Sequence, residues 1–147
     1  MEPLLTDLRS CYKELSNYKY QLTEDYRVGV EASPSRAVET PYLSFSGSGQ
    51  LIIRKGYAWD GPSGPTIDTI TFMRGSLVHD ALYQLMRMAV LDHTESREYA
   101  DRLLRKMCVE DGMWKFRAWY VYVALRWFGR KSALPSEREG PKVICTP

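Results

Sequence analysis

The stretch Tyr57-Ala-Trp-Asp-Gly-Pro-Ser-Gly-Pro-Thr-Ile-Asp68 divides the chain into two halves of different character. Its glycines and prolines disfavour regular secondary structure. Before this stretch apolar and polar residues alternate, as in half-buried strands, and after it apolar residues recur at helical spacing. The sequence therefore predicts an α+β fold, in which N-terminal antiparallel β-strands and a hairpin precede a Gly/Pro loop and three C-terminal helices.

The N-terminal half has the pattern of short strands. Four runs are rich in Tyr, Val, Ile and Leu, and they lie at residues 18–22, 26–30, 42–45 and 51–53. Gly47-Ser-Gly49 separates the last two runs and predicts a hairpin turn. Residues 3–16 instead carry a helical stripe of leucines, which predicts a short N-terminal helix.

Three helices are predicted in the second half, over residues 75–91, 94–110 and 114–128. Thr94 would begin the second helix, although Arg97 stands where a capping box requires Glu or Gln. Gly129 follows the third helix, at the position where glycine commonly ends a helix.

The length of 147 residues fits one domain. We expect it to comprise a β part, a site loop, a helical part and a tail, over residues 18–56, 57–70, 71–130 and 131–147. The formal net charge is only +2, but residues 101–147 carry ten Lys or Arg against five Asp or Glu. This excess of positive charge indicates that the C-terminal segment contacts an anionic surface or substrate.

The three cysteines, Cys11, Cys108 and Cys145, form no CxxC pair. This pattern favours a reducing compartment over a disulfide framework or a thiolate zinc site. We expect no signal peptide at the N-terminus and no transmembrane segment, because the longest apolar run, Ala118–Leu125, is shorter than the ~20 residues that span a bilayer.

His79-Asp80-Ala-Leu-Tyr83 lies in the first predicted helix and is the best candidate for chemistry. Helical spacing places His79, Asp80 and Tyr83 toward one side. An antiparallel second helix would bring Asp101 beside His79, so that His79 activates a water molecule and Asp101 orients the imidazole. Taken alone, a His-Asp pair is more often a structural feature of a helix start than a catalytic one.

The preceding loop adds oxygen ligands suited to a hard cation such as Ca²⁺. The candidate metal ligands are Asp80, Asp60, Gly61, Ser63 and Asp68. Common nucleotide-binding, serine-hydrolase and zinc-protease motifs are absent from the sequence, and so is any specific nucleic-acid motif.

The chain resembles a phage-associated family catalogued as domain of unknown function 1353. The resemblance covers about residues 18–130 and is carried by Asp60-Gly61-Pro62-Ser63, His79-Asp80-Ala81-Leu82-Tyr83, Ala100-Asp101 and Gly129. It implies a bacteriophage or prophage origin, and therefore a place in the host cytoplasm or the virion. It implies no activity.

A second, local resemblance is to the active-site helix of phospholipase A2 of the bacterial and fungal type. This resemblance implies that His79 is the base, Asp80 the calcium ligand and Asp101 the orienting residue, with Tyr83 in the same catalytic cluster. The glycine pattern of the calcium loop and the disulfides of the secreted enzymes are not matched here.

Residues 114–128 combine Trp and Tyr with basic residues, as helices at a lipid or membrane surface do. The alternative, which the sequence favours, is a core helix whose Trp and Tyr tips reach polar partners.

Two functions follow as alternatives. The first is a calcium-dependent, phospholipase-like hydrolase acting on a lipid or other envelope ester. The second is a non-enzymatic phage accessory or virion-associated protein with a virion or host protein partner, in which the His-Asp-Tyr cluster is structural.

Overall fold

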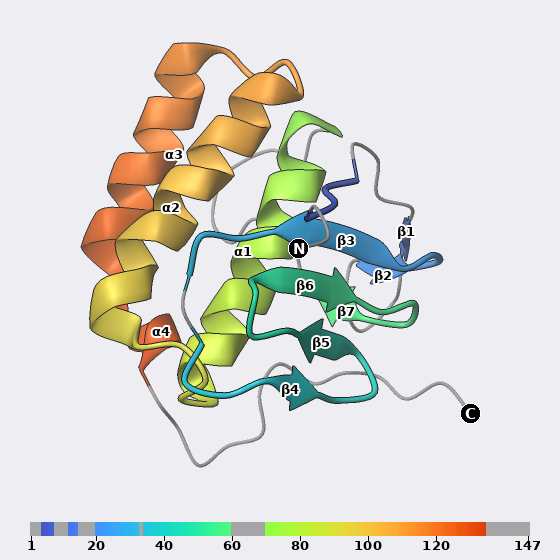
Figure 1. Cartoon of the computed structure of the whole chain (residues 1–147). Helices are drawn as coiled ribbons and strands as arrows, with labels where there is room; N and C mark the ends of the chain where they lie inside the picture. Colours follow the sequence, from blue (N-terminus) through green and yellow to red (C-terminus); the bar gives the residue numbers. More distant parts are fainter. Residues whose placement is uncertain (1–3, 8–11, 15–19, 33, 60–69, 135–147) are drawn as a thin grey trace.

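Two small antiparallel sheets precede three long helices in the computed structural model, as the sequence predicted (Figure 1). The structure describes residues 4–7, 12–14, 20–32, 34–59 and 70–134. One sheet has the strand order β1-β2-β7 and consists of Tyr12–Glu14, Tyr20–Leu22 and Ala58–Trp59. The other has the order β3-β6-β5-β4, its strands being Tyr26–Gly29 (β3), Gln50–Ile53 (β6), Leu43–Phe45 (β5) and Val38–Glu39 (β4).

The register of the β5–β6 hairpin places its apolar residues on one face. Phe45 pairs with Leu51 and Leu43 pairs with Ile53, and all four side chains are buried. The predicted turn between these strands is confirmed: Gly49 has a φ of 95°, and its N–H donates to the Ser46 carbonyl at 3.1 Å. Glycine adopts this left-handed backbone without a steric penalty.

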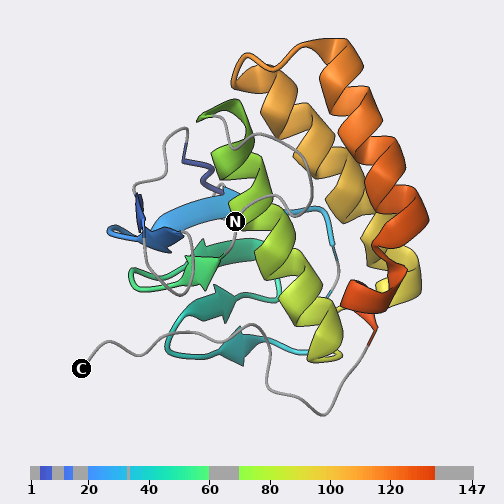
Figure 2. The ribbon, with the colours of Figure 1, turned by 180° about the vertical axis from the view of Figure 1, so that it is seen from behind.

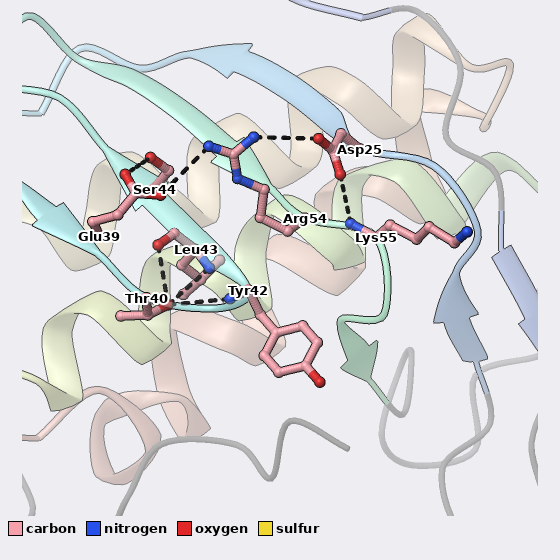
Figure 3. A network of polar contacts seen from close by, with 8 residues as sticks. All are labelled: Asp25, Glu39, Thr40, Tyr42, Leu43, Ser44, Arg54 and Lys55. Atoms are coloured by element: carbon pink, nitrogen blue, oxygen red, sulfur yellow. Dashed lines mark hydrogen bonds and ion pairs between the residues drawn. The ribbon is translucent and has the colours of Figure 1, made fainter. Parts of the chain in front are cut away.

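A polar network on this sheet links the residue before β3 to β4, β5 and the end of β6 (Figure 3). Arg54 donates to Asp25 at 3.2 Å and to Glu39 at 3.4 Å, and the backbone N–H of Lys55 donates to Asp25 at 2.7 Å. Ser44 donates to Glu39 as well. These side chains are partly or largely exposed, so their ion pairs add little to the stability of the sheet. They lie on the sheet and take no part in the site described below.

The helices are α1 (Ile70–Arg87), α2 (His93–Glu110), α3 (Lys115–Phe128) and the short α4 (Arg130–Ala133). Helix α1 lies between the strands and the α2–α3 pair (Figures 1 and 2). Both sides of α1 are therefore covered, and most of its residues are buried, from Phe72 to Met86. The main core joins α1 to both sheets, and a second cluster joins Phe72 to α2 and α3.

The predicted boundaries of two helices need correction. Helix α1 begins at Ile70 rather than Gly75, because Phe72 and Met73 are buried by packing that outweighs the weak helix propensity of Ile70 and Thr71. Asp92, not Thr94, caps α2: its carboxylate accepts from the Thr94 N–H at 3.3 Å and from the Thr94 hydroxyl at 2.7 Å.

The prediction of an N-terminal helix over residues 3–16 is wrong. Residues 4–7 are irregular and 12–14 form β1, while the intervening residues lie outside the described part. The Leu5 N–H and carbonyl both bond the Gln50 side-chain amide, at 2.8 and 3.0 Å, and the Asp7 N–H donates to the Arg27 carbonyl at 2.7 Å. These backbone groups are satisfied by β3 and β6 instead of by a helix of their own.

Gly129 follows the last residue of α3, as the sequence predicted, but its backbone is not in the left-handed conformation that glycine often adopts there. Its φ is −81°, and the chain continues directly into α4. A Cβ at this position would lie 2.7 Å from the Leu125 carbonyl oxygen and 2.8 Å from the Tyr83 hydroxyl. Gly129 is thus required by close packing rather than by backbone conformation.

None of the helices in the described part of the chain has the length and apolar character needed to cross a bilayer. Cys108 is a buried free thiol on α2, whereas Cys11 and Cys145 lie outside the described residues.

Candidate active site

The short connection between α1 and α2 reverses the chain and makes these helices antiparallel neighbours. Ala89 adopts a φ of 58° in this connection, and the N–H groups of Ala89 and Val90 bond back to the carbonyls of Met86 and Leu85. Gly75 lets the helices approach, since a Cβ there would lie 2.7 Å from Leu104 Cδ1. The close pairing brings residues 22 positions apart into direct contact.

Asp101 lies at the centre of this contact and is fully buried. Its Oδ1 is 2.7 Å from His79 Nε2 and accepts from the Tyr83 hydroxyl at 2.6 Å. Its Oδ2 accepts from Arg126 of α3 at 3.2 Å. The predicted adjacency of His79 and Asp101 is confirmed, and Tyr83 joins them, because its ring centroid lies 4.1 Å from that of His79.

The second nitrogen of His79 lies on the side of Asp80. His79 Nδ1 is 3.9 Å from Asp80 Oδ1, which is ion-pair range when the imidazole is protonated. The Asp80 side chain is 35% exposed, against 8% for His79. Since Nε2 is engaged by Asp101, Nδ1 is the nitrogen that remains for proton exchange with a third group.

His79 and Asp101 shift each other's pKa values in opposite directions, because their charged forms attract each other. Burial lowers the pKa of His79, but the Asp101 and Asp80 carboxylates outweigh it and hold that pKa above its ordinary 6.5. Burial raises the pKa of Asp101, but hydrogen bonds from His79 and Tyr83 outweigh it and hold that pKa below 3.8. Asp101 therefore stays anionic at neutral pH. The Tyr83 pKa is raised, mainly by burial and then by Asp101.

Two arginines that were not among the predicted site residues lie near the Asp101 carboxylate, Arg126 on α3 and Arg97 on α2. Arg126 contacts Asp101 directly, and Arg97 donates to the carbonyls of Leu125 and Arg126 at 2.8 and 2.5 Å. Arg97 also helps to lower the pKa of Asp101. For Arg126 the sequence signal was a basic residue in the last turn of a helix, which fits helix-end capping equally well.

Tyr57 was missed as well. Its side chain is fully buried, and its hydroxyl has no hydrogen-bond partner within the described residues. Burial raises its pKa strongly, with a further contribution from nearby Asp80. Its position just before the Gly/Pro loop was the available signal.

Four of the five predicted metal ligands lie in the predicted loop before α1. Asp60, Gly61, Ser63 and Asp68 lie outside the described residues, so their predicted convergence on His79 and Asp80 stays a prediction. Within the described ranges, no group of three or more His, Cys, Asp or Glu side chains is arranged to hold a metal ion. Asp80 is the one predicted ligand that the structure places, beside His79.

Fold and site together define an α+β protein in which a histidine, a tyrosine and an arginine converge on a buried aspartate between packed helices. The chain belongs to the family described as Protein of unknown function (DUF1353), and the match covers residues 37–125, more than half of the chain. The matched range contains His79, Asp80, Tyr83 and Asp101 but stops short of Arg126. It is narrower than the range of 18–130 expected from the sequence. No curated protein and no solved structure matches the chain.

Proposed function

We propose that the protein is a hydrolase in which His79 is the general base and Asp101 orients it. The observation that carries this proposal is the 2.7 Å contact between His79 Nε2 and Asp101 Oδ1. The contact commits one imidazole nitrogen to a buried carboxylate and leaves the other, Nδ1, for a water molecule.

In the proposed reaction, Nδ1 of neutral His79 accepts a proton from water as the water oxygen attacks an ester carbonyl. The Nε2–H bond to Asp101 fixes the reactive tautomer, and the anionic carboxylate stabilises the imidazolium that forms. The same proton then passes to the leaving alkoxide, which returns His79 to its neutral form. Tyr83 and Arg126 act by positioning Asp101.

Calcium remains part of the proposal through Asp80, with Asp60, Gly61, Ser63 and Asp68 as the further ligands. A bound Ca²⁺ would polarise the ester carbonyl as a Lewis acid. The described residues provide only one carboxylate for it, so the steps above state only what the protein's own side chains do, and the cation would add the polarisation of the carbonyl.

The proposed substrate class is a lipid or other envelope ester. It is supported by the local resemblance of His79, Asp80, Tyr83 and Asp101 to the active-site residues of phospholipase A2, and by the exposed aromatic residues of α3. A phage or prophage origin, with the protein in the host cytoplasm or virion, rests on the sequence resemblance alone.

A structural role for the cluster is the second candidate, and one observation favours it. His79 is only 7% exposed, and its contacts with Asp101 and Tyr83 form an internal network of the kind that locks helices together. The protein would then be a non-enzymatic accessory protein with a virion or host partner.

A calcium titration of the full chain on phospholipid vesicles tests the hydrolase proposal. We expect fatty-acid release that rises with Ca²⁺, is abolished by chelation, and requires more Ca²⁺ in Asp80→Asn. Asp25→Asn, which changes a carboxylate on the sheet, is the matched control and should behave as wild type. Absence of fatty-acid release at every Ca²⁺ concentration would exclude the calcium-dependent lipid hydrolase.

A further inference from the structure

The outward face of α3 is covered by aromatic side chains. Phe116, Trp119, Tyr120 and Trp127 are 75%, 46%, 54% and 76% exposed, and we call these four residues the outer stripe. At each end of the helix one more aromatic residue is exposed, Trp114 or Phe128. The preference for a core helix is thus corrected: only Ala118 and Val121 of α3 are buried.

Helical geometry explains why the outer stripe is left uncovered. Ala118, Val121 and Leu125 point toward α2 and the second core cluster, and the outer stripe, at spacings of three, four and seven residues, lies on the opposite side. Helix α3 is also the outermost of the three long helices, on the side away from the sheets (Figures 1 and 2). Nothing else in the described part of the chain is packed over this face.

The segment that carries the outer stripe has charged residues of one sign only. Residues 112–134 contain five Lys or Arg and no Asp or Glu. Lys115 and Arg130 are exposed at the two ends of α3, and the Arg105 guanidinium of α2 lies 5.6 Å above the Tyr122 ring at its flank. An aromatic face bordered by cations is complementary to an anionic surface.

We propose that the outer stripe of α3 docks the protein on an anionic lipid surface. Trp and Tyr rings favour the boundary between acyl chains and headgroups, and the flanking cations favour anionic headgroups. A second copy of the chain fits less well, since it would place two basic segments against each other. This docking does not depend on hydrolysis, so it stands or falls separately from the activity proposed for His79.

Co-sedimentation of the full chain with vesicles tests the docking. Wild type should bind mixed phosphatidylglycerol–phosphatidylcholine vesicles, bind pure phosphatidylcholine much more weakly, and be released as salt rises. Replacing Trp119 and Trp127 together by Ser should weaken binding by about tenfold or more, because the buried apolar area is lost. Ile70→Ser removes an 80% exposed apolar side chain from α1 and should leave binding unchanged.

Far-UV circular dichroism of each variant measures whether the helices are retained. If the double variant fails to fold, Trp127→Ser alone replaces it, and a blue shift of tryptophan fluorescence on vesicle binding, reduced in that variant, supports the proposal. Equal binding by wild type and variant would overturn it. The proposal would also be overturned if wild type did not bind anionic vesicles but instead formed a dimer, or bound RNA, through the outer stripe.

Discussion

His79 Nε2 lies 2.7 Å from Asp101 Oδ1, although the two residues belong to different helices and are 22 positions apart. The contact determines that Nε2 of the imidazole is held by Asp101, while Nδ1 lies on the side of Asp80. It also keeps Asp101 anionic despite its burial, because the bond from His79 lowers the pKa of that carboxyl. The functional proposal rests on this pair, and each of the following variants disturbs it from a different side.

Asp101→Asn tests the orienting carboxylate. An amide at this position presents its N–H₂ or its weaker oxygen to Nε2, so it no longer selects the reactive tautomer or stabilises the imidazolium. We expect kcat for ester hydrolysis to fall by about 10²–10⁴-fold with a small change in KM, measured by steady-state kinetics. An undiminished kcat in a folded Asp101→Asn protein would contradict the orienting role, whereas Asp25→Asn serves as the control.

The pH dependence of stability and of activity should run in opposite directions. Because the folded-state pKa of His79 lies above 6.5, its stabilising contribution is complete below pH 6.5 and is lost as the pH rises through the folded-state pKa. Because the pKa of Asp101 lies below 3.8, its contribution is present above pH 3.8 and is lost as the pH falls through the folded value. Hydrolysis requires neutral His79 and should rise with pH through a pKa above 6.5.

Denaturant titrations and kcat/KM profiles between acid and alkaline pH measure both effects on the same protein. In wild type the unfolding free energy should fall as the pH rises above 6.5, because His79 loses its proton. In His79→Gln this part of the pH dependence should be absent. A wild-type rate profile with its midpoint well below pH 6.5 would contradict the assignment of His79 as the base.

Tyr83→Phe removes one hydrogen bond to a buried carboxylate while keeping the ring. Asp101 retains His79 and Arg126, so the protein should fold but lose about 1–3 kcal/mol of unfolding free energy, as expected for a hydrogen bond to a charged group. Urea denaturation monitored by tryptophan fluorescence gives the value. A stability equal to that of wild type would mean that the Tyr83 hydroxyl is not bound to Asp101.

Gly129→Ala tests the packing of α3 and α4 against Tyr83. The new Cβ would meet the Leu125 carbonyl oxygen at 2.7 Å and the Tyr83 hydroxyl at 2.8 Å, and one of them must move. We expect a loss of about 1–3 kcal/mol in unfolding free energy. Gly47→Ala, where the Cβ would meet nothing within 4 Å, is the matched control and should change stability far less.

Sequence patterns predicted the elements that short-range rules govern. The alternation around Leu43, Phe45 and Leu51 indicated the β5–β6 hairpin, and helical spacing indicated α1, α2 and α3. The adjacency of His79 and Asp101 followed as well, because a short connection makes neighbouring helices antiparallel.

Long-range contacts explain what the sequence did not predict. Residues 3–16 carry apolar side chains at helical spacing, but the backbone of Leu5 and Asp7 is bound by the Gln50 amide and the β3 backbone, 20 and more residues away. Arg126 reaches Asp101 only because α3 packs against α2. The aromatic residues of α3 are apolar enough for a core, and no local pattern shows that the fold leaves one of its faces uncovered.

The most direct test of the central claim is hydrolysis of phospholipid by wild type and His79→Ala, with thermal denaturation of both proteins with and without Ca²⁺. The proposal predicts that His79→Ala lowers the rate by about 10²–10⁴-fold, the cost of losing a general base. The variant should still fold, with a loss of stability comparable to that of Tyr83→Phe, because Asp101 keeps its bonds to Tyr83 and Arg126. The proposal also predicts that Ca²⁺ raises the melting temperature of wild type. No hydrolysis by wild type and no effect of Ca²⁺ on its melting temperature would contradict the hydrolase and leave a structural His-Asp-Tyr cluster.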